Sequence, residues 1–177
     1  MMTGDFSGRT VARSCEGRIS HKKAQKAQKE WNASQPHCWK SYLRPSERTA
    51  ELAEINRLCD VIRQTSFEIH KFLRSGHLEK VYENALAHRL SKIGIAFTQQ
   101  HPLNVCDEDG TLLGHFCADL FVEDKLVVEV KACRGLIDDH VAQLLGYLRA
   151  SRIEHGLLIN FGSPKLQIKK YILDRHT

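Results

Sequence analysis

Two apolar runs joined by a tight turn, in the segment CADLFVEDKLVVEVKA at 117–132, constrain the fold of this chain most strongly. Apolar and β-branched residues on both sides of Glu123 and Asp124 predict a β-hairpin in a buried sheet. Yet Glu129 and Lys131 stand inside the second run, and residues two apart on a strand point to the same face. The hairpin is therefore predicted to aim a carboxylate and an ammonium group in one direction.

Helical and strand periodicities around the hairpin predict a mixed α/β domain. Apolar residues at helical spacing indicate an amphipathic helix over 47–74, which the SGH sequence at 75–77 ends, and a second helix over 78–94. The remaining patterns indicate strands at 101–105, 114–122, 125–132, 155–161 and 165–173, with a helix over 138–150 before the last two strands. This order predicts a sheet flanked by helices.

The uneven charge of the chain separates an N-terminal extension from this domain. Residues 1–50 contain ten Lys and Arg against four Asp and Glu, whereas residues 51–177 contain sixteen against seventeen. Residues 1–46 also lack an apolar stripe, so we expect a basic, flexible extension there and the domain over 47–177. The extension could attract nucleic acid or could be a solvated tail.

Membrane, secretory and zinc signals are missing from the sequence. No apolar run is long enough to span a membrane, and the N-terminus lacks the apolar core of a secretory signal. The six cysteines show no CxxC spacing, which argues against a zinc site. We therefore expect free thiols, a cytoplasmic location and no membrane partner.

Asp119 adds a second carboxylate on the first strand of the hairpin. Hairpin strands lie about 5 Å apart, so Asp119 and Glu129 can converge near one point. Two close carboxylates repel unless a cation sits between them, and a hard divalent ion such as Mg²⁺ suits an all-oxygen site. Lys131 could then orient or help deprotonate a water, or stabilise charge on a phosphate. The alternative is a solvated face with a surface ion pair between Glu129 and Lys131.

Two helices provide further candidates. At about 100° per residue, the apolar arc of the helix over 78–94 contains Glu79 and leaves Glu83 just outside. An inward Glu79 needs a partner, which a metal site or an ordinary buried salt bridge would provide.

On the helix over 138–150, the polar residues His140, Gln143 and Tyr147 lie within about 60° of one another, as residues lining a site would. The alternative for this helix is a solvent-exposed stripe, which we prefer for His140 taken alone.

These segments together resemble a known family. Asp119 and the EVK sequence at 129–131 follow the D-x(n)-E-x-K pattern of the PD-(D/E)XK nuclease superfamily, and GHLEKVY at 76–82 matches the signature of the GxxExxY protein family. Other segments similar to that family are FEIHKFLRSGHLEKVYENAL, GIAFTQQHPLNV, DDHVAQLLGYL and GLLINFGSPKLQIKKYIL. The resemblance covers about residues 52–173 and leaves out the first fifty residues.

The resemblance implies a restriction-endonuclease-like α-β-β-β-α-β core, with a mixed central sheet flanked by helices, and a metal-dependent phosphodiesterase site. Asp119, Glu129 and Glu79 would bind Mg²⁺, or Mn²⁺, and Lys131 would be the catalytic lysine.

The resemblance also assigns residues around these ligands. Gln143 and Tyr147 match a Q-x-x-x-Y element that borders the site, with Gln143 counted among the catalytic residues, and Tyr82 and His140 are candidate lining residues. Cys117 departs from the family, which commonly has Arg there, so a phosphate or carboxylate contact would be lost.

Two functions stay open at this point. The first is a Mg²⁺-dependent endo- or exonuclease that acts on DNA or RNA. The second is a non-catalytic nucleic-acid-binding or protein-interaction module, since a fold does not fix a function. The intact set of Asp119, Glu129 and Lys131 favours the enzyme. The net charge of −1 over 51–177 argues mildly against strong DNA binding by the domain alone. The basic tail or a partner protein could supply the missing charge, and a homodimer stays open.

Overall fold

The structure is a computed structural model that describes residues 44–173. The predicted flexible extension over 1–46 therefore lies almost entirely outside the described residues. Helix α2 (Pro45–Leu73) begins two residues before the predicted start of the domain. Within residues 44–173, none of the helices combines the length and the apolar character that a membrane span requires.

The helices and strands follow the order that the sequence predicts. After α2 come α3 (Glu79–Lys92), β1 (Phe97–Cys106), β2 (Leu112–Val122), β3 (Leu126–Lys131), α4 (Asp138–Ser151), β4 (His155–Asn160) and β5 (Gln167–Ile172). The strands form a five-stranded sheet in the order β1-β2-β3-β4-β5. The β3–β4 pair is parallel and the other pairs are antiparallel. The predicted restriction-endonuclease-like core, a mixed sheet flanked by helices, is confirmed.

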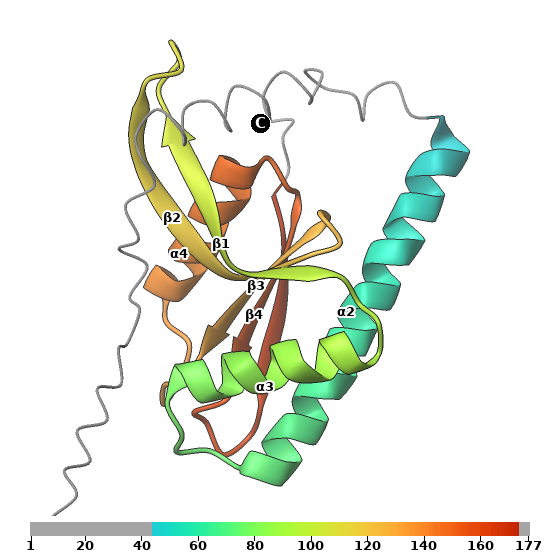
Figure 1. Ribbon diagram of the computed structural model, residues 1–177, viewed down its shortest axis with the longest axis vertical. Coiled ribbons are helices and arrows are strands. Elements are labelled where there is room, and N and C mark those ends of the chain that lie inside the picture. Colours follow the sequence, from blue (N-terminus) through green and yellow to red (C-terminus); the bar gives the residue numbers. More distant parts are fainter. Residues whose placement is uncertain (1–43, 174–177) are drawn as a thin grey trace, which may run out of the picture. The chain divides into compact units, whose positions relative to one another are not determined.

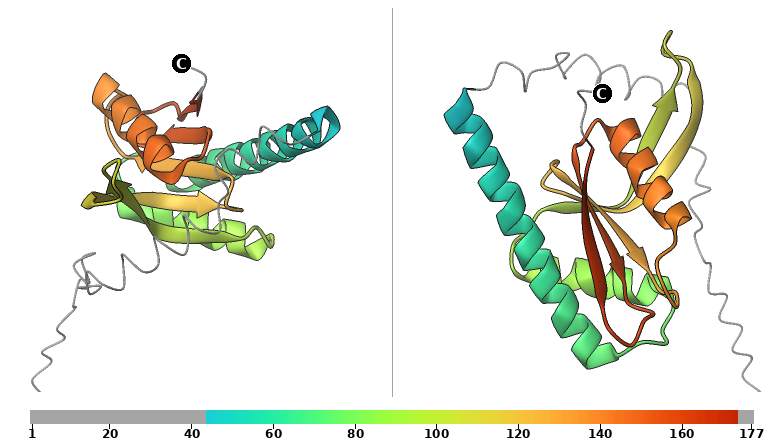
Figure 2. Two further views of the ribbon diagram at one scale, coloured as in Figure 1. Left: turned by 90° about the horizontal axis from the view of Figure 1, so that it is seen from above. Right: turned by 180° about the vertical axis from the view of Figure 1, so that it is seen from behind.

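Helices cover both faces of the sheet, as Figures 1 and 2 show. Helices α2 and α3 pack on one face, where Leu86 of α3 joins the same buried cluster as Val128 of β3. Helix α4 packs on the other face, where Leu144 joins the cluster that contains Val127 of β3. Because β3 is buried from both sides, its apolar run lacks the polar alternation of a half-exposed strand.

The order of the strands brings the sequence-predicted hairpin to the middle of the sheet. Strand β2 pairs with β3 through Leu120↔Val128, Phe121↔Val127 and Val122↔Leu126, and residues 123–125 connect the two strands. Within this connection Glu123 and Asp124 have positive φ angles of 51° and 53°, as the central residues of a tight primed turn do. Strand β5 pairs only with β4 in this sheet, so it is an edge strand as the sequence predicts.

Candidate active site

Asp119 and Glu129 occupy facing positions on β2 and β3, one step beyond the last paired residues of the hairpin. The register that pairs Leu120 with Val128 brings Asp119 opposite Glu129. Asp119 is 8% exposed, and its Oδ2 accepts a hydrogen bond of 2.8 Å from the backbone N–H of Val130. The carboxylate of Asp119 thus bonds to the backbone of β3 just where the paired residues of the hairpin end.

Glu129, which is buried, forms an ion pair with Lys131, which is largely shielded from solvent. The Nζ of Lys131 donates to Oε1 of Glu129 over 2.7 Å, and the two side chains are 12% and 3% exposed. The alternative prediction of a solvated surface pair is therefore wrong. The second oxygen of Glu129, Oε2, is buried and has no hydrogen-bond partner. A buried acceptor without a partner is rare in folded proteins and costs free energy.

Burial and mutual repulsion hold both carboxyl groups closer to their protonated forms. Burial, reinforced by the negative charge of Asp119, raises the pKa of Glu129 to about 8 despite the bond from Lys131. Burial also raises the pKa of Asp119 to about 6, with a smaller contribution from neighbouring glutamates. Burial opposes the charge of Lys131, but its bond to Glu129 and the surrounding negative charge outweigh this and raise its pKa. The site thus disfavours ionisation of both carboxyl groups as long as Lys131 is the cation beside them.

The first turns of α3 contribute two glutamates, and the predicted helical phase is wrong. Glu83 is buried at 2% exposure, whereas Glu79 is only half-buried. Leu78 and Val81, which defined the far edge of the predicted arc, are in fact exposed, whereas Ala87, which lies beyond Glu83 on the helical wheel, is buried. The buried face of the helix is therefore rotated toward Glu83. Leu78 precedes the helix as its N-cap, so it does not belong to the buried stripe.

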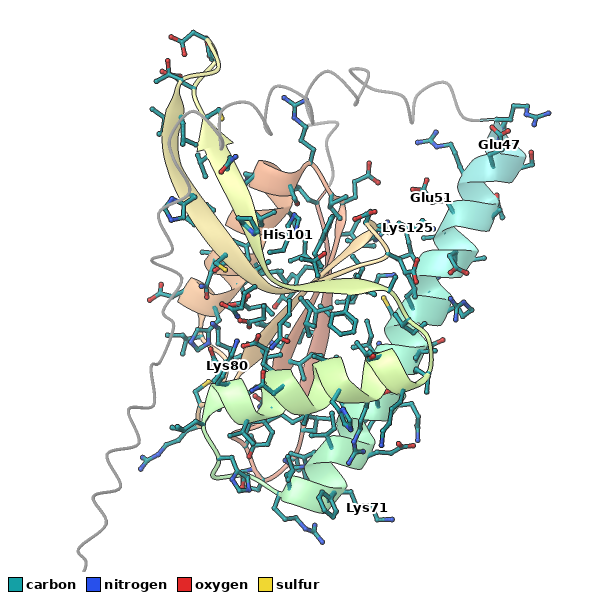
Figure 3. All side chains as sticks on the ribbon, viewed as in Figure 1. Glu47, Glu51, Lys71, Lys80, His101 and Lys125 are labelled. Carbon is teal, nitrogen blue, oxygen red and sulfur yellow. The ribbon has the colours of Figure 1, made fainter. Side chains whose placement is uncertain are left out.

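Each of the two glutamates has a different relation to the site. Each carboxylate oxygen of Glu83 accepts a hydrogen bond from Lys80, which lies at the start of α3 (Figure 3). Glu83 also accepts a bond of 2.6 Å from Gln99 of β1. These partners satisfy its carboxylate oxygens, yet its charge also raises the pKa of Asp119, more than the charge of Glu79 does. The charge of Glu79 raises the pKa of both Asp119 and Glu129. Both glutamates are therefore electrostatically coupled to the site, Glu79 to both of its carboxyl groups and Glu83 to Asp119.

The corner between α2 and α3 explains the G-x-x-E-x-x-Y pattern. Gly76 has a φ of 113°, which side chains rarely tolerate. The hydroxyl of Tyr82 donates to the carbonyl of Arg74 over 2.7 Å and accepts from the N–H of His77 over 3.2 Å. These bonds fix the turn that starts α3 and so fix Glu79. Tyr82 is fully buried in the core, so its prediction as a site-lining residue is wrong.

Helix α4 places Tyr147 near the carboxyl groups of the site, whereas its His140 bonds to the backbone at the start of the helix. Burial, reinforced by the charges of Glu129 and Asp119, raises the pKa of Tyr147 to about 12. Gln143 donates to the hydroxyl of Tyr147 over 2.7 Å. The Nδ1 of His140 instead accepts from the N–H that precedes α4, over 3.3 Å, which favours the structural interpretation of this histidine.

Sequence reasoning missed Gln100, which donates from Nε2 to Oδ1 of Asp119 over 3.1 Å. It missed this residue because the predicted strand began at His101, whereas β1 begins at Phe97. The paired glutamines at 99 and 100, polar residues just before a strand pattern, were the available signal.

The carboxylates suit a hard divalent cation. Among the described residues, no three His, Cys, Asp or Glu side chains gather closely enough to form a complete protein cage for a metal. Mg²⁺ seldom needs such a cage, because it is usually bound through one or two carboxylates and keeps several waters. Asp119 and Glu129 provide two carboxylates, and Oε2 of Glu129 is a buried acceptor without a partner. The donor set therefore fits Mg²⁺.

Three comparisons relate the chain to known proteins. The family model of the PD-(D/E)XK nuclease superfamily matches residues 56–171. No curated protein matches the chain significantly. One similar solved structure, titled "Crystal structure of SSO0001", is 21% identical with a TM-score of 0.46. The similarity covers 54% of this chain and 52% of that one, so this chain spans about half of that protein.

Proposed function

The chain belongs to the PD-(D/E)XK nuclease superfamily, and from this premise we propose that it is a Mg²⁺-dependent nuclease acting on DNA or RNA. The observation that carries the metal dependence is the buried Oε2 of Glu129, which lacks a hydrogen-bond partner beside a second buried carboxylate. Lys131 bonds to Oε1 and leaves Oε2 without a donor, and the pKa of Glu129 is raised because the group is costly to ionise there. A divalent cation, with Mn²⁺ as the natural substitute, would stabilise the ionised form.

The proposed roles follow from the contacts of each side chain. A bound divalent ion supplies a Lewis acid that polarises the phosphate and lowers the pKa of a bound water. Asp119 and Glu129 would hold that ion, and the charge of Glu79 would strengthen its binding. Lys131 has three N–H donors and gives one to Glu129, so it can donate to a phosphate oxygen or to the attacking water. Gln143 would border the site through its bond to Tyr147.

We also propose that the chain is a member of the GxxExxY family within the superfamily. The sequence matches the signature, and the structure gives each of its named residues a role. Gly76 provides the positive φ, Tyr82 closes the turn onto the backbone, and Glu79 lies between them in the first turn of α3. The three named positions of the signature thus build one corner, which presents one charged side chain to the site.

The basic residues that precede α2 are proposed to assist nucleic-acid binding. Residues 51–177 contain sixteen Lys and Arg against seventeen Asp and Glu, so the domain has little net attraction for phosphates. A chain that starts at Glu47 should show a shallower salt dependence of binding than the full chain. A cytoplasmic location, a protein partner and a homodimer stay predictions.

Cleavage assays with matched aspartate variants test the proposal. The full chain is incubated with single-stranded DNA, duplex DNA and RNA in Mg²⁺, in Mn²⁺ and in chelator. We expect metal-dependent cleavage of at least one substrate, its loss in Asp119→Asn and its retention in Asp124→Asn, which alters an exposed turn residue. If no substrate is cleaved in either metal, the nuclease proposal is wrong and the non-catalytic binding module replaces it.

A further inference from the structure

The backbone of Gln100 is unusual for a residue inside a strand. Its φ is 53°, in the left-handed region, although it lies in the interior of β1. Glutamine gains nothing locally from this conformation, which only glycine adopts freely and which asparagine and aspartate tolerate best. Such strain persists where the surrounding structure fixes it, and it concentrates at functional sites.

The conformation of Gln100 coincides with a break in the pairing of β1 with β2. Gln99 pairs with Leu120 and His101 pairs with Ala118, while the register of the two strands omits Gln100 and Asp119, which face each other between these pairs. The strands also change direction near their middle, as Figure 1 shows. The break therefore lies directly opposite the carboxylate of Asp119.

The side chains of β1 also exchange the sheet faces to which they point near Gln100. Phe97, three residues before Gln100, packs against the cluster of α2 and α3. Leu103, three residues after it, belongs to the cluster of α4. Strict alternation would place the odd-numbered residues 97 and 103 on one face, so the chain reverses its faces in between. The reversal frees the side chain of Gln100 to reach Asp119.

The amide of Gln100 completes the fixation of Asp119. Its Nε2 donates to Oδ1 of Asp119 over 3.1 Å, while Oδ2 is bonded to the N–H of Val130 over 2.8 Å. Bonds to both oxygens fix the plane of the carboxylate. The thiol of Cys117 in turn contacts Oε1 of Gln100 over 3.5 Å, which orients the amide with its nitrogen toward Asp119.

We propose that Gln100 is a positioning residue, which adopts a strained backbone conformation in order to orient Asp119 for binding a divalent metal ion. The inference rests on the proposed metal site and assigns the role of Gln100 within it. Residues that hold a metal ligand in place typically contribute tenfold to hundredfold in metal affinity or activity. The competing explanation is that Gln100 serves only the bend of β1.

Replacement of Gln100 by glycine separates the two explanations. Glycine accepts the positive φ and keeps the bend, but it removes the amide. The matched control is Thr98→Gly, which places glycine on the same strand at an exposed residue. The measurements are Mn²⁺ binding by calorimetry, thermal unfolding in chelator, and kcat and KM on any substrate that the wild type cleaves.

We expect Gln100→Gly to weaken Mn²⁺ binding at least tenfold and to lower kcat more than it raises KM, without a lower melting temperature than Thr98→Gly. The control should lose some thermal stability and keep wild-type Mn²⁺ affinity. Gln100→Asn, which tolerates the same φ but has a shorter side chain, should also bind Mn²⁺ more weakly. This second variant decides the question if the glycine variant does not fold.

Wild-type Mn²⁺ affinity in both Gln100 variants would overturn the inference. The explanation that would remain is that Gln100 serves only the bend of β1. Failure of the nuclease proposal is distinguishable from this result. A wild-type protein that binds Mn²⁺ but cleaves nothing would refute the nuclease, while the calorimetric comparison would still decide the role of Gln100. A wild-type protein that binds no Mn²⁺ would refute both.

Discussion

Replacing Glu129 by glutamine should stabilise the metal-free protein at alkaline pH, although the substituted side chain is buried. Burial raises the pKa of Glu129 from an ordinary value of 4.5 to about 8. Between these two values the folded state keeps a proton that the unfolded state releases. The free energy of unfolding contributed by this group is therefore highest below pH 4.5 and is lost as the pH rises toward 8.

The size of the effect follows from the same two pKa values. A full difference of this size corresponds to about 5 kcal/mol of unfolding free energy. Within the more accessible range from pH 5.5 to pH 8.5, the wild type should lose about 3 kcal/mol through this group. Glutamine has no titrating proton, so Glu129→Gln should not show this loss. The stability of the variant relative to the wild type should thus rise by about 3 kcal/mol over that range.

Urea unfolding in chelator at several pH values measures this difference. Titrating groups that do not interact with Glu129, such as the half-buried His101 with its lowered pKa, affect both proteins equally and cancel in the comparison. The control is Glu108→Gln, a change at an exposed residue of the β1–β2 turn, which should run parallel to the wild type at every pH. A difference between Glu129→Gln and wild type that stays constant from pH 5.5 to pH 8.5 would refute the reasoning, because it would mean that burial does not perturb Glu129.

Four further substitutions test the rest of the site. Lys131→Met should abolish cleavage and lower the free energy of unfolding in chelator by about 1–3 kcal/mol, because it removes the donor to a buried oxygen; nuclease assays and urea unfolding check this. Glu83→Gln should cost about 1.5–3 kcal/mol of stability because it breaks a buried charged hydrogen bond, whereas Glu79→Gln should change stability by less than about 0.5 kcal/mol and weaken Mn²⁺ binding more. Equal effects of both glutamate variants on unfolding and calorimetry would contradict this division. Gly76→Ala should destabilise by about 1–3 kcal/mol through its positive φ alone, since no atom lies within 4 Å of the added methyl group. An unchanged unfolding midpoint would contradict it.

The fold could be predicted from the sequence because local and long-range signals agree there. The run around Val127 and Val128 is apolar on both sides of the strand, which is typical of a central strand under two helical layers. The tight turn at Glu123 and Asp124 indicated a hairpin in which Asp119 and Glu129 converge. The exact register could not be predicted from the sequence, because three residues, 123–125, connect the strands, pair Val122 with Leu126 and so bring Asp119 opposite Glu129.

The contribution of α3 could not be predicted because a helical wheel assumes that apolar residues define the inward face. Leu78 and Val81 violate this assumption, and Glu83 takes an inward position. A glutamate can be buried there because Lys80 reaches it from the same helix and Gln99 reaches it from β1. The second partner depends on the pairing of distant strands, which the periodicity of one helix does not contain.

The start of β1 was missed for a related reason. Gln99 and Gln100 have polar side chains with low strand propensity, so the apolar pattern began later, at His101. Both glutamines in fact bond carboxylates that other elements supply, Glu83 and Asp119. Their presence in a strand is explained by those acceptors and not by the preferences of the backbone.

The hydrogen bonds of the buried carboxylates single out Glu129. Glu83 receives two bonds from Lys80 and one from a strand, and Asp119 receives one bond on each oxygen. Each of these buried oxygens has a donor within the protein, which accounts for Glu83 and fixes Asp119 as a preorganised ligand of the proposed metal site. Glu129 receives one bond from Lys131 and has a second buried oxygen without a donor, and its pKa is raised the most. A chain selected for stability alone would have an apolar residue or a second donor there. The buried Oε2 of Glu129 therefore lowers the free energy of unfolding, and a cation bound at this oxygen would recover the most free energy.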